Sequence, residues 1–250
     1  MPLTVHILFL ACVALATFSQ NLTGFAFGLI LLGLVGAFGL VPVADAANVS
    51  SILSIVNVWS YCRHHRVRPH WPLLRPMLAS SFVGVGCGVA LLGWLSANSV
   101  HALRLALGVT IIVCAVLLLA QRRPPARPSG RPALWFFGVF SGLLGGLFST
   151  PGPPMVYHLY RQPIDRDLAR HCLLLMFGAN AALRLALVGV DGNLSWNSVY
   201  LAAEAVPVVY GVSWLQARHP PHLPRRAVEW IVCGLLAVAG GSLLASGLKG

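Results

Sequence analysis

Apolar residues gather into stretches separated by short polar segments. The stretches span about residues 3–20, 24–41, 45–62, 77–95, 101–120, 133–149, 154–160, 168–188, 196–215 and 227–247. Most of them approach the ~20 residues that an α-helix needs to cross roughly 30 Å of hydrocarbon. The stretch 154–160 is too short to cross, so we expect it to form a re-entrant hairpin with 133–149. This pattern predicts an all-α, polytopic membrane protein.

The pattern occurs twice along the chain. A small polar patch interrupts the apolar sequence at 18–24 (FSQNLTG) and again at 148–154 (FSTPGPP). After each patch comes an apolar helix that carries an asparagine expected to be buried, Asn57 or Asn180. Broken helices at matching places in two halves are typical of secondary transporters. The predicted units are a first transmembrane repeat at 1–120, a cytoplasmic linker at 121–132 and a second repeat at 133–250.

Charge supports a membrane location and argues against nucleic acid. Only 9% of the residues are charged and 57% are hydrophobic, whereas a soluble domain carries about 25% charged residues. The net charge is +11, but fourteen of the 17 Lys and Arg residues fall in four short segments, at 63–75, 122–131, 161–170 and 218–226. This is the positive-inside pattern of cytoplasmic loops. We therefore expect the lipid bilayer, and no nucleic acid, as the partner of these basic segments.

The basic segments also predict the topology. If all four are cytoplasmic, the hairpin of 3–20 and 24–41 enters from the outside, and the hairpin of 133–149 and 154–160 enters from the cytoplasm. Each repeat is then a helical hairpin followed by three transmembrane helices. Because three is odd, the second repeat is inverted relative to the first, and both termini lie on the exterior side.

Glycine spacing predicts where helices approach closely. GxxxG pairs occur at Gly24 and Gly28, at Gly84 and Gly88, and at Gly142 and Gly146. Such pairs let two helix backbones come into contact inside a membrane.

The candidate binding residues are polar groups at and after the two patches. A helix that starts at a break directs free N–H groups and its positive dipole end toward the break, which suits an anion. The predicted substrate-binding residues are Ser19, Asn21, Thr23, Asn57, Ser149, Thr150, Gly152 and Asn180. The alternative is structural, because Pro and Gly shape turns, Ser and Thr cap helices, and Ser and Asn join packed helices.

Two ionisable residues lie inside predicted membrane helices. Glu204 is near the middle of 196–215, and Arg184 is about one turn from the end of 168–188. They form either a satisfied structural pair or a coupling pair, in which Glu204 relays a proton and Arg184 attracts an anion. The sequence has no nucleotide-binding motif, and we expect neither a cofactor nor a metal site.

The chain resembles a known transporter family. Residues 22–28 (LTGFAFG), followed by 43–59, resemble the first half of the sulfite exporter TauE/SafE family, also called the 4-toluene sulfonate uptake permease family. Residues 142–185, with the core GGLFSTPGPP, resemble its second half. The resemblance implies transport of sulfite or of organosulfur anions such as sulfonates and sulfoacetate. It also implies a multi-pass protein of the bacterial cytoplasmic (inner) membrane.

Two rival functions are open to the same sequence. An anion channel could use the same broken helices. A membrane-embedded thiol oxidoreductase would need two cysteines at one cavity, but the six cysteines do not occupy matching places in the two halves. We therefore expect a secondary transporter, and no enzyme, that moves a small sulfur-containing anion by alternating access. Uptake would require proton coupling through Glu204, whereas export would not.

Overall fold

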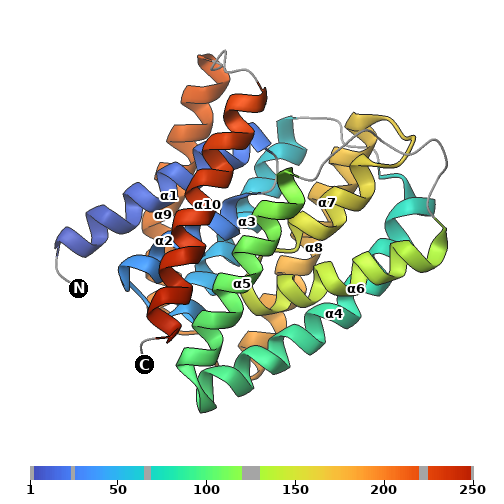
Figure 1. Cartoon of the computed structure of the whole chain (residues 1–250). Coiled ribbons are helices and arrows are strands. Elements are labelled where there is room, and N and C mark those ends of the chain that lie inside the picture. Colours follow the sequence, from blue (N-terminus) through green and yellow to red (C-terminus); the bar gives the residue numbers. More distant parts are fainter. Residues whose placement is uncertain (1–2, 24–25, 65–68, 120–129, 220–224, 249–250) are drawn as a thin grey trace.

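The computed structural model describes residues 3–23, 26–64, 69–119, 130–219 and 225–248 (Figure 1). Within these ranges the chain is helical and has no strand, which confirms the predicted all-α class. The helices are α1 (Leu3–Thr23), α2 (Phe27–Phe38), α3 (Val43–His64), α4 (Trp71–Asn98), α5 (Val100–Leu119), α6 (Arg131–Phe148), α7 (Gly152–Tyr160), α8 (Arg166–Val190), α9 (Trp196–Arg218) and α10 (Arg225–Leu248). The predicted linker falls outside the described residues except for 130–132.

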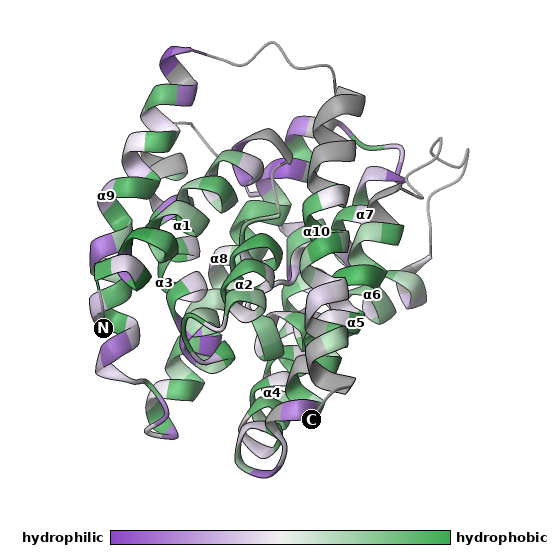
Figure 2. Ribbon diagram, turned by 60° about the vertical axis from the view of Figure 1, so that its left-hand side comes forward, coloured by the Kyte–Doolittle hydropathy of each residue, from purple (hydrophilic) through white to green (hydrophobic). Residues whose placement is uncertain are grey.

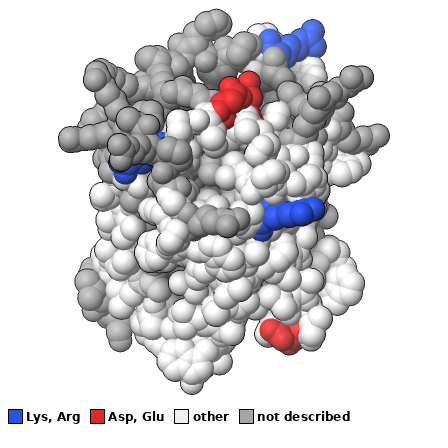
Figure 3. Space-filling model, turned by 90° about the vertical axis from the view of Figure 1, so that its right-hand side faces the viewer, with Lys and Arg blue, Asp and Glu red and all other residues white. Residues whose placement is uncertain are grey.

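Several helices have the length and composition of membrane spans. Four described segments are long and apolar enough to cross: Leu3–Asn21, Trp71–Asn98, Asp167–Val190 and Trp196–Gln216. The apolar parts of α2, α3, α5, α6 and α10 within the described residues are shorter. The helices are apolar along most of their length, with hydrophilic residues mainly near their ends (Figure 2). On the face shown in Figure 3, few of the described residues are charged. The surface therefore suits contact with lipid.

The helices pack in pairs that correspond between the two halves. α4 lies along α6, α1 lies along α9, and α5 packs against α10 (Figure 1). α3 packs against α8 and α9, and α8 packs against α3 and α4. If α1–α5 are taken in order as the equivalents of α6–α10, the α4–α6 pair corresponds to α9–α1 and the α3–α9 pair to α8–α4. The α5–α10 and α3–α8 pairs correspond to themselves. The inversion of one half relative to the other stays a prediction.

The second hairpin breaks where the sequence predicts. α6 ends at Phe148, and Ser149 follows it with a left-handed backbone (φ 54°). The Ser149 amide donates to the Gly145 carbonyl at 2.9 Å and so caps the helix. Pro151 precedes α7, which begins at Gly152. Because proline cannot continue a helix, α6 and α7 remain separate elements.

The first hairpin differs from the prediction. The polar residues 18–23 are helical, because α1 continues to Thr23 and α2 begins at Phe27. The expected break within this patch is therefore corrected to one that follows Thr23. The segment 18–23 contains no proline, so nothing in its covalent structure stops the helix as Pro151 does in the second half.

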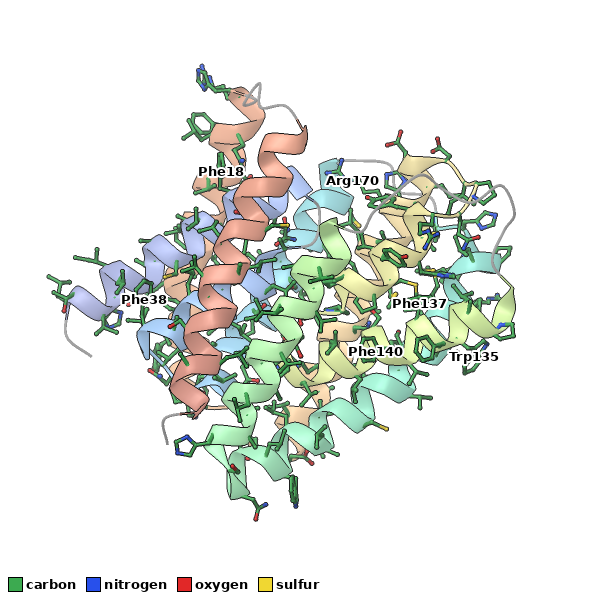
Figure 4. The ribbon with its side chains drawn as sticks, viewed as in Figure 1. Phe18, Phe38, Trp135, Phe137, Phe140 and Arg170 are labelled. Carbon is green, nitrogen blue, oxygen red and sulfur yellow. The ribbon has the colours of Figure 1, made fainter. Side chains whose placement is uncertain are left out.

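Aromatic side chains divide α6 into an outer and an inner face. Trp135, Phe136 and Phe140 are exposed by 45%, 66% and 37%. Phe137 instead stacks on His158 of α7, with ring centroids 4.8 Å apart. Figure 4 labels Trp135, Phe137 and Phe140 along this helix. The exposed rings suit a lipid-facing surface, and the inner ring fixes α7 against α6.

Candidate functional site

A small cavity lies beside the break between α6 and α7. Its volume is about 30 Å³, which is room for about two water molecules. Its polar lining comprises Gln20, Ser54, Ser149, Thr150 and Asn180, and its apolar lining includes Phe27, Val58, Leu174 and Phe177. Both halves of the chain therefore contribute walls to one cavity.

Ser149 holds the most constrained backbone position in this site. It is the only non-glycine residue with positive φ in the described part of the chain, and a left-handed conformation costs an L-residue roughly 1–2 kcal/mol. Its hydroxyl accepts a hydrogen bond from the Ser51 hydroxyl at 2.9 Å. A glycine would relax the backbone but would lose this hydroxyl. Strain of this kind at a cavity wall points to a functional side chain.

Three buried side chains leave polar atoms unpaired around the break. Ser81 donates to Asn180 Oδ1 at 2.9 Å, while Asn180 Nδ2 has no partner. The hydroxyls of Thr150 and Ser50 also lack partners, although all three side chains are at most 4% exposed. Thr150 and Ser50 are brought together at Gly28, where an added methyl would lie 2.7 Å from Thr150 Cγ2 and 3.1 Å from Ser50 Oγ. An unpaired buried polar group costs about 1–3 kcal/mol, so this cluster is suited to hydrogen-bonding a molecule held in the cavity.

Arg184 anchors the same region from behind the cavity wall. It lies one turn beyond Asn180 on α8 and is 0% exposed. Its Nε donates to the Gly146 carbonyl at 2.9 Å, and its Nη1 donates to Asn48 Oδ1 at 2.8 Å and to Ser51 Oγ at 3.1 Å. Its Nη2 has no partner. The guanidinium is thus fixed along one edge and free at the other.

The charge of Arg184 is not neutralised by a described carboxylate. Glu204 is paired elsewhere, because His6 Nδ1 lies 2.8 Å from Glu204 Oε2. The Glu204–Arg184 pair considered from the sequence is therefore not formed. A buried cation without a counter-ion is strongly unfavourable unless a ligand supplies the negative charge.

These groups can bind a small anion. Arg184 Nη2 and Asn180 Nδ2 can only donate hydrogen bonds, and the Thr150 and Ser50 hydroxyls can donate as well. The N-terminus of α7 faces the cavity through Gly152, but its next two residues are prolines, which have no N–H. Side chains, more than the backbone, must therefore bind the ligand. The described residues contain no cluster of His, Cys, Asp or Glu that could hold a metal ion.

The predicted site residues fall into two groups. Ser149, Thr150, Gly152 and Asn180 all line the cavity. Ser19 is buried and Asn57 is half-buried, and neither lines it. Asn21 donates to Ser213 Oγ at 3.1 Å and to Gln216 Oε1 at 2.6 Å, so it joins α1 to α9. The side chain of Thr23 lies outside the described residues. The structure therefore brings together the four second-half residues and leaves Ser19, Asn21 and Asn57 outside the cavity wall.

Sequence reasoning missed the residues that hold Arg184. Asn48 and Ser51 are three positions apart on α3, so they share one helix face. This spacing was a usable signal, since it marks a polar face on an otherwise apolar helix. Gln20 was visible in the polar patch, and the structure places it in the cavity wall.

Comparison with known proteins agrees with a transporter. The sequence profile of a family described as "Sulfite exporter TauE/SafE" matches residues 8–243. The chain belongs to the sulfite exporter TauE/SafE family. A relative from Cupriavidus necator, named "Probable sulfite/organosulfonate exporter TauE", is 32% identical over 236 residues, which cover 94% of this chain and 91% of the relative. No solved structure matches the chain. The TauE/SafE proteins are membrane transporters and not enzymes, so the expected family and functional class are confirmed.

Proposed function

We propose that this protein exports a small sulfur-containing oxyanion, sulfite or a short organosulfonate, across the bacterial cytoplasmic membrane. The observation that carries the proposal is the cluster of unpaired donors at the α6–α7 break, next to an arginine without a carboxylate. The family and the name of the Cupriavidus necator relative supply the class of cargo. The cluster supplies a chemical reason for a negative charge to bind there.

The cavity lining is suited to a compact anion. Its volume of about 30 Å³ favours a small anion over a long organic one. Thr150 and Asn180 offer neutral donors to oxygen atoms, while Phe27 and Phe177 provide an apolar wall for a sulfur lone pair or a short alkyl group. Neutral donors in direct contact also allow release, because a fully buried ion pair would hold the anion too tightly.

Transport follows if the two halves take turns in opening the cavity to either side. Repeats inverted around a central site produce alternating access in secondary transporters. The membrane potential favours export of a monoanion by about 2.3 kcal/mol per 100 mV, inside negative, so export requires no coupled ion. Glu204 does not line the cavity and pairs with His6. We therefore assign Glu204 to the contact between α1 and α9 and propose no proton coupling.

Exchange of radiolabelled sulfite in proteoliposomes tests the proposal. Vesicles loaded with unlabelled sulfite should transiently accumulate labelled sulfite from outside as the unlabelled anion leaves. A carrier produces this counterflow, whereas a channel does not. Ser149→Gly should slow this exchange at least 10-fold while raising the free energy of unfolding by about 1 kcal/mol, because the left-handed backbone is relieved and the hydroxyl is lost. Wild-type protein that exchanges neither sulfite nor short sulfonates would refute the function, and label movement without counterflow would indicate a channel.

A further inference from the structure

The environment of Arg184 leaves a full positive charge inside the protein. Its hydrogen-bond acceptors are the Gly146 carbonyl, the Asn48 amide and the Ser51 hydroxyl, all of which are neutral. Asp45 lies on α3, as do Asn48 and Ser51, but its carboxylate accepts a hydrogen bond from the Ser198 hydroxyl at 2.8 Å. Among the carboxylates that the structure describes, none pairs with this guanidinium, whereas an ordinary structural arginine would have an acidic partner.

This charge lies directly behind the cavity wall. Ser51 accepts from Arg184 Nη1 and contacts Ser149 Oγ, and Ser149 lines the cavity. Asn180, one turn away on the same helix, also lines it. The residues between the guanidinium and the cavity are buried, so water does not screen the charge of Arg184 as it would at the surface.

We propose that Arg184 determines the charge preference of the site and favours doubly over singly negative oxyanions. Asn48 and Ser51 are positioning residues, because they hold the Nη1 edge of the guanidinium in place behind the cavity wall. The inference rests on the proposed function and deepens it by naming the preferred charge of the cargo. A fixed charge attracts a ligand in proportion to the ligand's own charge. The preference for a dianion is therefore the property that distinguishes this role from a structural one.

Two ligands of similar shape test the inference. At mildly alkaline pH sulfite is chiefly a dianion, whereas methanesulfonate, which adds one methyl group, is a monoanion. We expect purified wild-type protein to bind sulfite more tightly in calorimetric titrations. Arg184→Gln should weaken sulfite binding about 100-fold and methanesulfonate binding about 10-fold, because removing one charge acts twice as strongly on the logarithm of the dianion's affinity. Arg184→Lys should keep most of the preference for sulfite, since it keeps the charge.

A second variant removes the charge without removing the arginine. Asn48→Asp places a carboxylate where the amide oxygen accepts from Nη1 at 2.8 Å, so it should neutralise the guanidinium and keep its position. We expect Asn48→Asp to raise the thermal stability of the protein and to reduce the sulfite preference as Arg184→Gln does. Asn98→Asp adds the same charge at the exposed end of α4 and should change neither affinity.

The outcomes separate the inference from the function on which it rests. Wild-type protein that binds neither anion would refute the proposed function. If the wild-type protein binds both, equal losses for the two ligands in Arg184→Gln and Asn48→Asp would overturn the charge preference. Unchanged sulfite affinity in a folded Asn48→Asp variant would overturn it as well. A larger loss of affinity for sulfite than for methanesulfonate in both variants, with Asn98→Asp unaffected, would support it.

Discussion

Two equivalent helix pairs, α4 with α6 and α1 with α9, are held together in different ways. Between α4 and α6 the backbones touch through glycines. A methyl added at Gly88 would lie 2.9 Å from the Gly146 Cα, and one added at Gly142 would lie 2.8 Å from the Ser81 Cα. Contact of this kind depends on the shape of both backbones and leaves no room for side chains to rearrange.

The α1–α9 pair is joined by side chains instead. His6 contacts Glu204 at 2.8 Å, and Gln216 Nε2 donates to the Phe18 carbonyl at 3.2 Å. On α9, an added methyl at Gly211 would meet nothing within 4 Å. Hydrogen bonds between side chains can be exchanged one for another at little cost, whereas interlocked backbones cannot. The comparison teaches that two equivalent arms of one fold can differ in stiffness, and we expect α1 against α9 to be the moving contact.

Joining α1 to α9 covalently should have the largest effect on transport. Cysteines at positions 6 and 204, in a background where the exposed Cys62 and Cys87 are serine, can be bridged by a short bifunctional thiol reagent. We expect the bridge to abolish sulfite exchange in proteoliposomes. Each single cysteine treated with the same reagent is the control. Full exchange by bridged protein would show that this contact does not move.

Filling the α4–α6 contact should have the largest effect on stability. Gly142→Ala would push a methyl group into the Ser81 backbone, so we expect a loss of about 3 kcal/mol in the free energy of unfolding. Gly86→Ala on α4 is the matched control, because an added methyl meets nothing within 4 Å there. It should be neutral or stabilising by up to about 1 kcal/mol. Equal thermal stability of the two variants in detergent would contradict the fixed character of this pair.

Asn21 distinguishes a packing residue from a binding residue. Its amide bonds to Ser213 and Gln216 of α9, so Asn21→Ala should cost about 1 kcal/mol of stability. Sulfite affinity should stay within twofold of wild type, because Asn21 does not line the cavity. A tenfold weaker sulfite affinity in calorimetry, with unchanged stability, would return Asn21 to the binding site.

Glu204 should give the smallest effect. The His6–Glu204 pair is partly exposed, with side-chain exposures of 30% and 46%, and such pairs contribute about 0–1 kcal/mol. Glu204→Gln should therefore lower stability by less than about 1 kcal/mol and leave sulfite exchange almost unchanged. An imposed pH gradient should not drive accumulation in either protein. If it drives accumulation in wild type and not in Glu204→Gln, the protein is proton-coupled.

The second-half wall of the cavity could be largely predicted from the sequence. Pro151 helps to end α6. Because a proline interrupts the helix that contains it, this helix end can be predicted from the local sequence alone. The glycine pairs at 84 and 88 and at 142 and 146 predicted close packing, which is confirmed. Asn180 was found because a single amide in an apolar helix must face a partner or a cavity.

The remaining parts depend on contacts between distant segments. Asn21 hydrogen-bonds to α9, and Arg184 hydrogen-bonds to α3. Sequence periodicity shows which face of its helix a residue occupies, but it does not show which other helix packs against that face. For the same reason the sequence allowed Arg184 as the partner of Glu204, and the structure pairs Glu204 with His6 instead. The first helix break was predicted a few residues too early. Segment 18–23 is polar, but it contains no residue that ends a helix.

The central claim is that a small anion binds at the α6–α7 break, and anomalous diffraction tests it most directly. Crystals grown with selenite, the selenium analogue of sulfite, would give an anomalous signal at the anion itself. We predict one peak within hydrogen-bond distance of Thr150 Oγ1 and Asn180 Nδ2, which is lost in Ser149→Gly. An anomalous selenium peak at full occupancy elsewhere in the membrane region, with none beside Thr150 and Asn180, would contradict the account.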